Sequence, residues 1–199
     1  MNNEHLNNLR HSCAHLLAAA VQELYPNAKR TIGPPIDSGF YYDFDFGEES
    51  ISDADLKKIE KKMKELVKHW KGFERKEVSL KEAKEFFADN EYKQELMDEF
   101  ADEGAQLTLY TWGEFTDLCR GGHCEEPNKE LRNFKLLSLA GAYWRGDENK
   151  KMLTRIYGTC FASKEELKAY LTMLEEAKKR DHRKLGKELE LFTLSDMVG

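Results

Sequence analysis

Two short motifs in this chain combine the residue types that hydrolytic and metal sites use. His11-Ser-Cys-Ala-His15 sets two imidazoles four residues apart, and Cys119-Arg-Gly-Gly-His123 repeats that spacing with a thiol and an imidazole. On a helix, side chains four residues apart lie on the same side. The two glycines of the second motif allow the backbone to approach a ligand closely and offer N–H donors.

These four side chains suit three kinds of chemistry. Three imidazoles and a thiolate form a ligand set for tetrahedral zinc. Without a metal, imidazoles with a pKa of about 6.5 can hold and deprotonate water at neutral pH. A cysteine beside a histidine can also act as a nucleophile. Residue types and spacing leave all three open.

Hydrophobic periodicity predicts the element that carries the first motif. Residues 6–24 repeat apolar side chains at three- and four-residue steps, which predicts a helix that Pro26 ends. At about 100° per residue, His11 and His15 face away from the apolar stripe of this helix. Their neighbours on that side are alanines, which leaves room for a cleft.

Further elements follow along the chain. Residues 39–46 alternate aromatic and polar side chains and predict a half-buried strand. A helix is predicted from Ser52, its N-cap, to Trp70, and a capping box at Ser79 predicts a short helix as far as Phe87.

The second half of the chain turns strand-like. Residues 89–105 match no pattern, and Ser163 with Glu166 caps a last long helix. Strands are predicted within 107–115, 134–139, 142–146 and 152–161. Helices and strands do not alternate regularly, which predicts an α+β fold.

Composition excludes several protein classes. The 199 residues are 40% hydrophobic and 34% charged, with a net charge of −6, as expected for a globular protein. No run approaches the roughly 20 apolar residues of a membrane span, and no signal peptide is recognisable. Four cysteines without a CxxC pair favour the cytoplasm. Basic residues dominate 144–187 although the whole chain is acidic, so this segment could face phosphate.

Several segments together resemble the editing domain of threonyl-tRNA synthetases. The motifs HSCAH and CRGGH occur in the same order as in that family, separated by about a hundred residues. Three more segments support the resemblance: IGPPIDSGFYYDFD, AGAYWRGDENKKMLTRIYGTCF (140–161) and LEEAKKRDHRKLGKELELF (174–192). Alanyl-tRNA editing domains also carry HxxxH and CxxxH, but AGAYWRGD and the C-terminal segment favour the threonyl branch.

The resemblance implies hydrolysis of seryl-tRNA(Thr), which forms when serine is mistaken for threonine. One missing methyl group is worth only about 1–3 kcal/mol of discrimination, so a second, hydrolytic site is needed. The implied fold has antiparallel sheets with packed helices. The implied organisation is an editing domain over 1–162, a linker helix over 163–192 and the start of a catalytic domain over 193–199.

The implied partners are the acceptor end of tRNA(Thr) carrying serine and the remainder of the synthetase, and no membrane is expected. Aminoacylation is not expected, because the chain ends at Gly199 before any class II catalytic motif. The small N-terminal domain common in this family is not expected in this sequence either, since HSCAH begins at residue 11.

The resemblance also assigns roles to individual residues. His11, His15, Cys119 and His123 line the hydrolytic pocket, and His11 holds the attacking water together with a lysine. The remaining positions are Lys93 as that lysine, Tyr42 as a pocket tyrosine, Asp117 as a ligand of the seryl amino group, and Arg120 as a contact of the terminal nucleotide.

One departure from the family and two alternatives remain. Gly122 stands where the family usually has proline, which loosens the loop. Editing in the threonyl branch is expected to need no metal. A zinc-dependent hydrolase of the alanyl type would instead bind zinc with the two motifs. A catalytically inactive tRNA-binding module would use basic residues such as Lys178, Lys179, Arg180 and Arg183.

Overall fold

Helix α1 (Asn3–Leu24) is the central element of the fold. A computed structural model describes residues 3–180 and divides the chain into two compact units, 1–162 and 163–199. The predicted helix over 6–24 is confirmed and begins three residues earlier. Its burial is not confined to one stripe, because Arg10 and Ser12 are buried as well as the apolar residues. Packing on several sides makes α1 a rigid base for the first motif.

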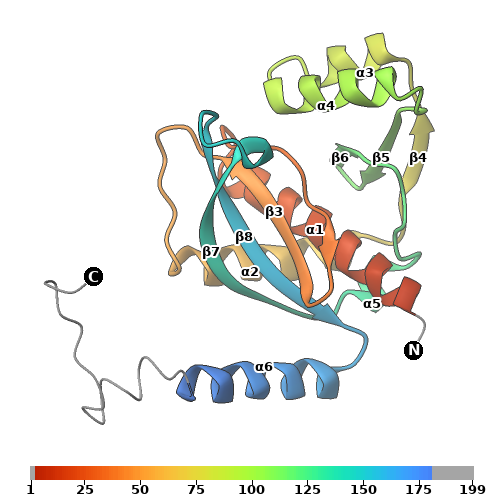
Figure 1. The fold of residues 1–199 in the computed structure, drawn as a ribbon. Coiled ribbons are helices and arrows are strands. Elements are labelled where there is room, and N and C mark those ends of the chain that lie inside the picture. The colour runs from red at the N-terminus through yellow and green to blue at the C-terminus, as the bar shows by residue number, and fades with distance from the viewer. Residues whose placement is uncertain (1–2, 181–199) are drawn as a thin grey trace, which may run out of the picture. The chain divides into compact units, whose positions relative to one another are not determined.

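A five-stranded antiparallel sheet lies against α1 (Figure 1). The strand order is β1-β3-β8-β7, and β2 pairs with β3. The strands are β1 (Lys29–Arg30), β2 (Pro35–Ile36), β3 (Gly39–Asp45), β7 (Asn133–Tyr143) and β8 (Met152–Phe161). The predicted α+β class is confirmed, and the sheet is antiparallel throughout.

The prediction that β3 is half-buried is wrong. Asp43 and Asp45 are buried along with the aromatic residues between them. Arg155 pairs with the Asp43 carboxylate through two bonds of 2.7 and 2.8 Å, and Tyr92 donates a hydrogen bond to Asp45. Paired carboxylates can be buried, and a polarity pattern does not reveal the partner.

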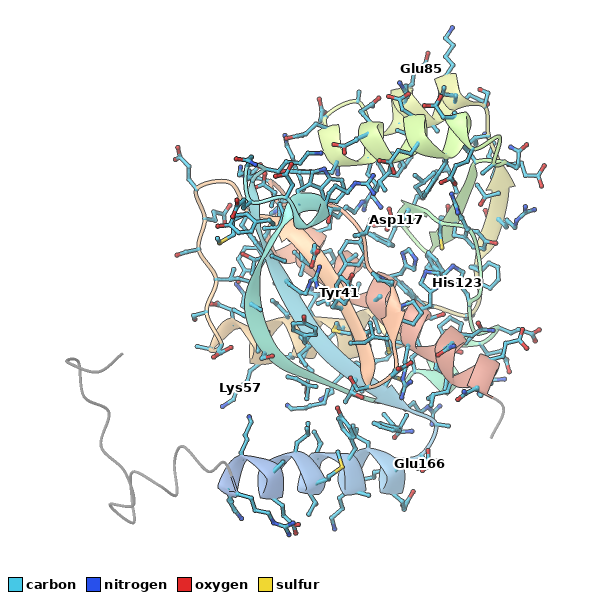
Figure 2. All side chains as sticks on the ribbon, viewed as in Figure 1. Tyr41, Lys57, Glu85, Asp117, His123 and Glu166 are labelled. Carbon is cyan, nitrogen blue, oxygen red and sulfur yellow. The ribbon has the colours of Figure 1, made fainter. Side chains whose placement is uncertain are left out.

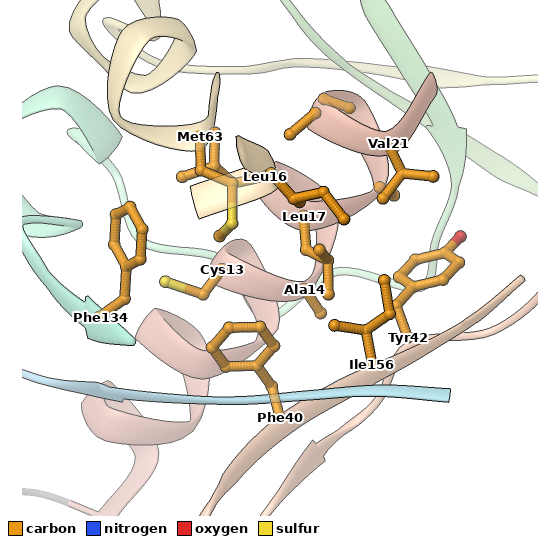
Figure 3. Close-up of a cluster of buried hydrophobic side chains, with 14 of the residues drawn as sticks. Cys13, Ala14, Leu16, Leu17, Val21, Phe40, Tyr42, Met63, Phe134 and Ile156 are labelled. Atoms are coloured by element: carbon orange, nitrogen blue, oxygen red, sulfur yellow. The ribbon is translucent and has the colours of Figure 1, made fainter. Parts of the chain in front are cut away.

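The main core lies between α1, the sheet and helix α2 (Asp55–Leu66). Figure 3 shows α1 side chains facing Phe40 and Ile156 of the sheet and Met63 of α2. Tyr42 lies at the edge of this cluster with its hydroxyl directed away from the apolar side chains. The core thus holds the ring of Tyr42 while its oxygen remains available to polar partners.

Ser52 is not the N-cap of α2, contrary to prediction. The N-cap is Ala54, and both the N–H and the hydroxyl of Ser52 bond to Asp55 instead. The helix ends at Leu66 and continues as a 3₁₀ turn, η1 (Val67–His69), so it does not reach Trp70 as an α-helix.

A second group of elements meets α1 at His15, whose ring stacks on Trp112. It consists of a three-stranded antiparallel sheet, two helices and their own apolar cluster. The elements are β4 (Glu74–Glu77), α3 (Leu80–Phe86), α4 (Glu91–Asp102), β5 (Thr108–Trp112) and β6 (Phe115–Leu118). The predicted capping box at Ser79 is confirmed. The predicted strand over 107–115 is a hairpin that turns at Gly113.

The prediction of a separate strand over 142–146 is wrong. Tyr143 ends β7, and η2 (Trp144–Gly146) is a turn that leads toward β8. Arg145 in this turn has a φ of 60° and is the only non-glycine residue among 3–180 with a positive φ. A short helix, α5 (Pro127–Glu130), precedes β7.

The second unit contains helix α6 (Lys164–Lys179), with the predicted capping box formed by Ser163 and Glu166. The rest of the predicted linker helix and the segment 193–199 lie outside the described residues. No helix among the described residues is long and apolar enough to cross a membrane.

Candidate active site

The two histidine-containing motifs meet at one place in the fold. Nε2 of His11 lies 3.3 Å from Nε2 of His15 and 3.4 Å from Sγ of Cys119. Nε2 of His123 lies 3.2 Å from the same sulfur. The four candidate ligand atoms all lie within 4.8 Å of one another. The predicted convergence of the motifs is therefore present in the structure.

The backbone after β6 sets the positions of Cys119 and His123. Gly121 and Gly122 have φ values of 105° and 82°, in the left-handed region that favours glycine. The Gly122 carbonyl accepts a hydrogen bond from Nδ1 of His11 at 3.1 Å. This bond places the proton of a neutral His11 on Nδ1 and leaves the Nε2 lone pair facing the cluster. Proline could not adopt this φ, so the loop differs from one with proline at this position.

Ser12 of α1 connects the cluster to the loop that carries His123. Its hydroxyl accepts a hydrogen bond from the backbone N–H of Cys124 and lies 3.4 Å from Nδ1 of His123. The ring of His15 stacks on Trp112 at a centroid distance of 4.9 Å. Sequence reasoning missed Ser12 and Trp112, because only the tertiary packing brings them to the histidines.

Asp117 is the centre of a second cluster beside the first. Its Oδ1 lies 2.8 Å from Nζ of Lys93, and its Oδ2 accepts a hydrogen bond of 2.8 Å from the Tyr42 hydroxyl. Nδ1 of His15 lies 3.1 Å from Oδ2 and joins the two clusters. Figure 2 shows Asp117 and His123 between the α3–α4 layer and α1. Three of the predicted residues, Tyr42, Lys93 and Asp117, are thus in direct contact.

Lys93 reaches Asp117 from α4, an element that the sequence patterns did not predict. Asn90 caps this helix by accepting a hydrogen bond from the Lys93 N–H. The buried face carries apolar residues at helical spacing, Tyr92, Leu96 and Met97, and Lys93 lies among them. The asparagine cap and this spacing could have predicted the helix, but the many acidic residues in the segment interrupt the apolar pattern.

Arg120 lies apart from both clusters. It is exposed, pairs with Glu103 at 2.6 Å and stacks over the Phe100 ring at 3.9 Å. It lines a cavity of about 340 Å³ together with all the predicted site residues except His123. Apolar residues complete the wall, including Ile32, Pro34 and Leu96. The cavity is therefore lined by an exposed cation, by members of both clusters and by apolar side chains.

The side chains of the first cluster differ in their protonation states. Burial opposes ionisation of Cys119, but the charge of His15 and the side-chain contacts with His11 and His123 lower the pKa of its thiol to about 3. Burial likewise opposes protonation of His15, but the Cys119 thiolate and Asp117 raise its pKa to about 9. Burial lowers the pKa of His123 to about 4. Cys119 and His15 thus form a thiolate–imidazolium pair, with His123 neutral.

The second cluster carries a cationic lysine in an apolar setting. Burial lowers the pKa of Lys93 below its usual value, although Asp117 opposes this effect. The pKa of Asp117 is well below its usual range despite burial, because Lys93, Arg30 and His15 surround it. Both Asp117 oxygens already have partners, so a substrate ammonium group would have to share them with Lys93.

The first cluster also fits a metal ion. Tetrahedral zinc binds nitrogen at about 2.0–2.1 Å and sulfur at about 2.3 Å, so its ligand atoms lie roughly 3.3–3.8 Å apart. The three contacts of 3.2–3.4 Å among these side chains approach that spacing. The hydrogen bond of His11 to Gly122 and the ion-pair contact of His15 with Asp117 are the kind of outer-shell contacts typical of metal-bound histidines. These residues could therefore bind a metal.

Comparison with known proteins agrees with the sequence motifs. Residues 107–157 match the family described as "Threonyl and Alanyl tRNA synthetase second additional domain". The chain is 59% identical to a threonine–tRNA ligase of Staphylococcus saprophyticus and 58% identical to those of Staphylococcus aureus strains JH9 and Newman. Each match covers 98% of this chain and 30% of the relative. The predicted resemblance to the editing domain of threonyl-tRNA synthetases is confirmed.

Proposed function

We propose that this chain hydrolyses the ester bond of seryl-tRNA(Thr). The main support is that His11, His15, Cys119, Lys93 and Asp117 line one cavity that also has apolar walls, with His123 in contact with Cys119 beside it. The similarity to threonine–tRNA ligases supports an aminoacyl-tRNA as the substrate class. The chain spans 30% of the length of these relatives, so the partner would be the rest of a synthetase holding the tRNA.

The proposed reaction is an attack by water on the ester carbonyl. The ring of His11 is oriented by the bond from its Nδ1 to Gly122, which turns Nε2 toward the cluster where the water would be held. His11 and Lys93 together position this water, and the constellation takes up one of its protons as the C–O bond to water forms. The proton passes to the ribose oxygen when the ester C–O bond breaks. Serine and the free tRNA terminus are the products.

Charge in the cavity would stabilise the tetrahedral intermediate. The oxyanion develops where the Lys93 ammonium group and the N–H groups of the Cys119–His123 loop can donate hydrogen bonds. We propose that Cys119 and His123 hold the substrate and do not form a covalent intermediate. Tyr42 and Asp117 keep Lys93 in place, and Arg120 contacts the terminal nucleotide.

The deciding experiment compares the deacylation of Ser-tRNA(Thr) and Thr-tRNA(Thr) by this chain. Hydrolysis of the seryl ester is expected to be much faster, and His11→Ala is expected to abolish it. His5→Ala is a matched control, because His5 lies on the same helix but pairs with Glu130 at the surface. Equal rates on both esters, or full activity of His11→Ala, would contradict the proposal. Binding without hydrolysis would instead indicate a tRNA-binding module.

A second candidate is a zinc-dependent hydrolase, which the close approach of the four ligand atoms favours. His11, His15, Cys119 and His123 would hold the ion, which would supply a more acidic bound water. Near-stoichiometric zinc by elemental analysis, together with loss of hydrolysis after chelation and its recovery with Zn²⁺, would support this candidate. Full activity after chelation would exclude it.

A further inference from the structure

Arg30 is a half-buried cation that neither the motifs nor the resemblance assigned to the site. It lies at the end of β1, and its side chain is 13% exposed. The guanidinium lies between two rings, 4.8 Å from the centroid of Phe115 and 5.4 Å from that of Phe87. Its Nε is 3.6 Å from Oδ1 of Asp117. The two rings thus hold the cation against the carboxylate.

Arg30 and Lys93 share one oxygen of one carboxylate. Nζ of Lys93 lies 2.8 Å from the same Oδ1, and its other polar contact is the Tyr42 hydroxyl at 3.2 Å. Two cations therefore face a single negative charge in a region from which water is largely excluded. Repulsion between like charges is strong at such a site and favours loss of a proton from the lysine, because arginine remains charged.

The remaining groups around Lys93 do not neutralise this excess of positive charge. His15 on α1 is a further cation but is balanced by the Cys119 thiolate. Tyr42 on β3 stays protonated, because burial raises its pKa well above the usual value. Phe87, at the end of α3, contributes only its ring face to Lys93. Arg30 is thus the cation that weakens the hold of Asp117 on the lysine proton.

We propose that Arg30 is a positioning residue that competes with Lys93 for Asp117 and so weakens the hold of this carboxylate on the lysine proton. The inference rests on the proposed hydrolysis and gives Lys93 a defined part in it. The neutral amine accepts a proton from the attacking water while His11 orients that water. The resulting ammonium group returns the proton to the departing ribose oxygen, so the protons balance over one turnover.

The first test is the pH dependence of seryl-tRNA(Thr) deacylation in Arg30→Met, which replaces the cation by an apolar chain of similar length. Lys93 is then held more tightly as the ammonium form, and the acidic limb of the profile is expected to move up by about one pH unit. The rate falls about tenfold on that limb and recovers at higher pH. Arg30→Lys retains a charge and is expected to restore the profile in part. Arg30→Gln carries the same test if the methionine variant does not fold.

The matched control is Lys29→Met. Lys29 is the neighbouring residue on β1 and pairs with Glu91 of α4 at the surface, at 2.6 Å. Its removal also deletes one positive charge and one contact to α4, but leaves Asp117 untouched. The pH profile is expected to stay in place. A uniform loss of rate at every pH in Arg30→Met, without a shift, would show a purely structural role and overturn the proposal.

A second readout does not depend on hydrolysis. NMR of ¹³Cε-labelled lysine follows the titration of Lys93, whose signal is assigned by its loss in Lys93→Met. Its midpoint is expected below that of the other lysines and should rise by about one unit in Arg30→Met. An unshifted midpoint overturns the role of Arg30 even if the chain deacylates seryl-tRNA(Thr). A shifted midpoint in a chain that does not deacylate it would refute the proposed function but retain the coupling of Arg30 and Lys93.

Discussion

Nδ1 of His15 lies 3.1 Å from Oδ2 of Asp117, with both side chains buried. Through this contact the histidine–cysteine cluster and the lysine–aspartate cluster form one connected group. The opposite ring nitrogen of His15 faces His11 at 3.3 Å. The contact links the carboxylate that holds Lys93 to the histidine proposed to hold water, so a change at Asp117 should affect both clusters.

Asp117→Asn is therefore expected to damage both stability and hydrolysis. The amide removes the carboxylate that Lys93 and Arg30 share and leaves these cations without it, which costs about 3–5 kcal/mol. Deacylation should fall by about 10²-fold or more, because Lys93 and His15 both lose their orientation. Urea unfolding and single-turnover deacylation measure the two effects.

Lys93→Met in the Asp117→Asn background separates these effects. Removing the stranded cation should recover part of the lost free energy of unfolding without recovering hydrolysis. If the single variant Asp117→Asn is as stable as the parent, the buried ion pair does not hold the site as described.

Cys119 should be alkylated at a rate that is nearly independent of pH between 5 and 8. Its pKa is lowered to about 3, so the thiolate is already fully formed at pH 5. An ordinary thiol with a pKa of about 8.5 would react about tenfold faster for each added pH unit over this range. Iodoacetamide labelling followed by mass spectrometry measures the rate at each cysteine.

The other cysteines serve as internal controls for that measurement. Cys13, Cys124 and Cys160 are buried, and burial raises the pKa of Cys13 and Cys124. They should stay unlabelled in the folded protein. A tenfold rise per pH unit at Cys119 would show that His15 does not stabilise its thiolate.

The local parts of the site could be predicted from the sequence, because they depend on short spacings. His11 and His15 are one helical turn apart, and the glycines after Cys119 indicate a loop with unusual backbone angles. The capping boxes at Ser79 and Ser163 are likewise local patterns, and both are present. The expected roles of these site residues remain predictions.

The parts that depend on tertiary partners could not be predicted. Asp43 is buried because Arg155 pairs with it from another strand, and Arg30 reaches the site because two aromatic rings hold it there. Nothing in the local sequence reveals such partners. Helix α4 was missed for a different reason: its apolar residues are interrupted by acidic ones that pair with Arg145 and Lys150.

Gly33→Ala is expected to lower deacylation by about tenfold or more through Tyr42. A Cβ atom at residue 33 would lie 2.1 Å from Cδ2 of the Tyr42 ring, which has no space to move within the core. Displacing this ring breaks the hydroxyl contacts to Asp117 and Lys93. Deacylation assays and thermal unfolding measure the loss.

Gly47→Ala is the control for the glycine experiment. A Cβ there meets no atom within 4 Å, but the φ of 63° makes alanine unfavourable by about 1 kcal/mol. It should destabilise the protein without affecting deacylation. Equal effects of Gly33→Ala and Gly47→Ala on deacylation would contradict the role of the Tyr42 ring.

Arg145→Gly should be more stable than Arg145→Ala by about 1 kcal/mol. Both variants lose the ion pairs of Arg145 with Glu95 and Glu99 of α4, so the comparison isolates the backbone. The φ of 60° costs alanine about 1–2 kcal/mol, which glycine avoids. The greater chain entropy of unfolded glycine offsets only part of this advantage. At Arg132, where φ is not positive, the same pair of substitutions should show the opposite order. Urea unfolding of the four variants tests this reversal. If alanine is more stable than glycine at both positions, the turn at Arg145 stores no strain.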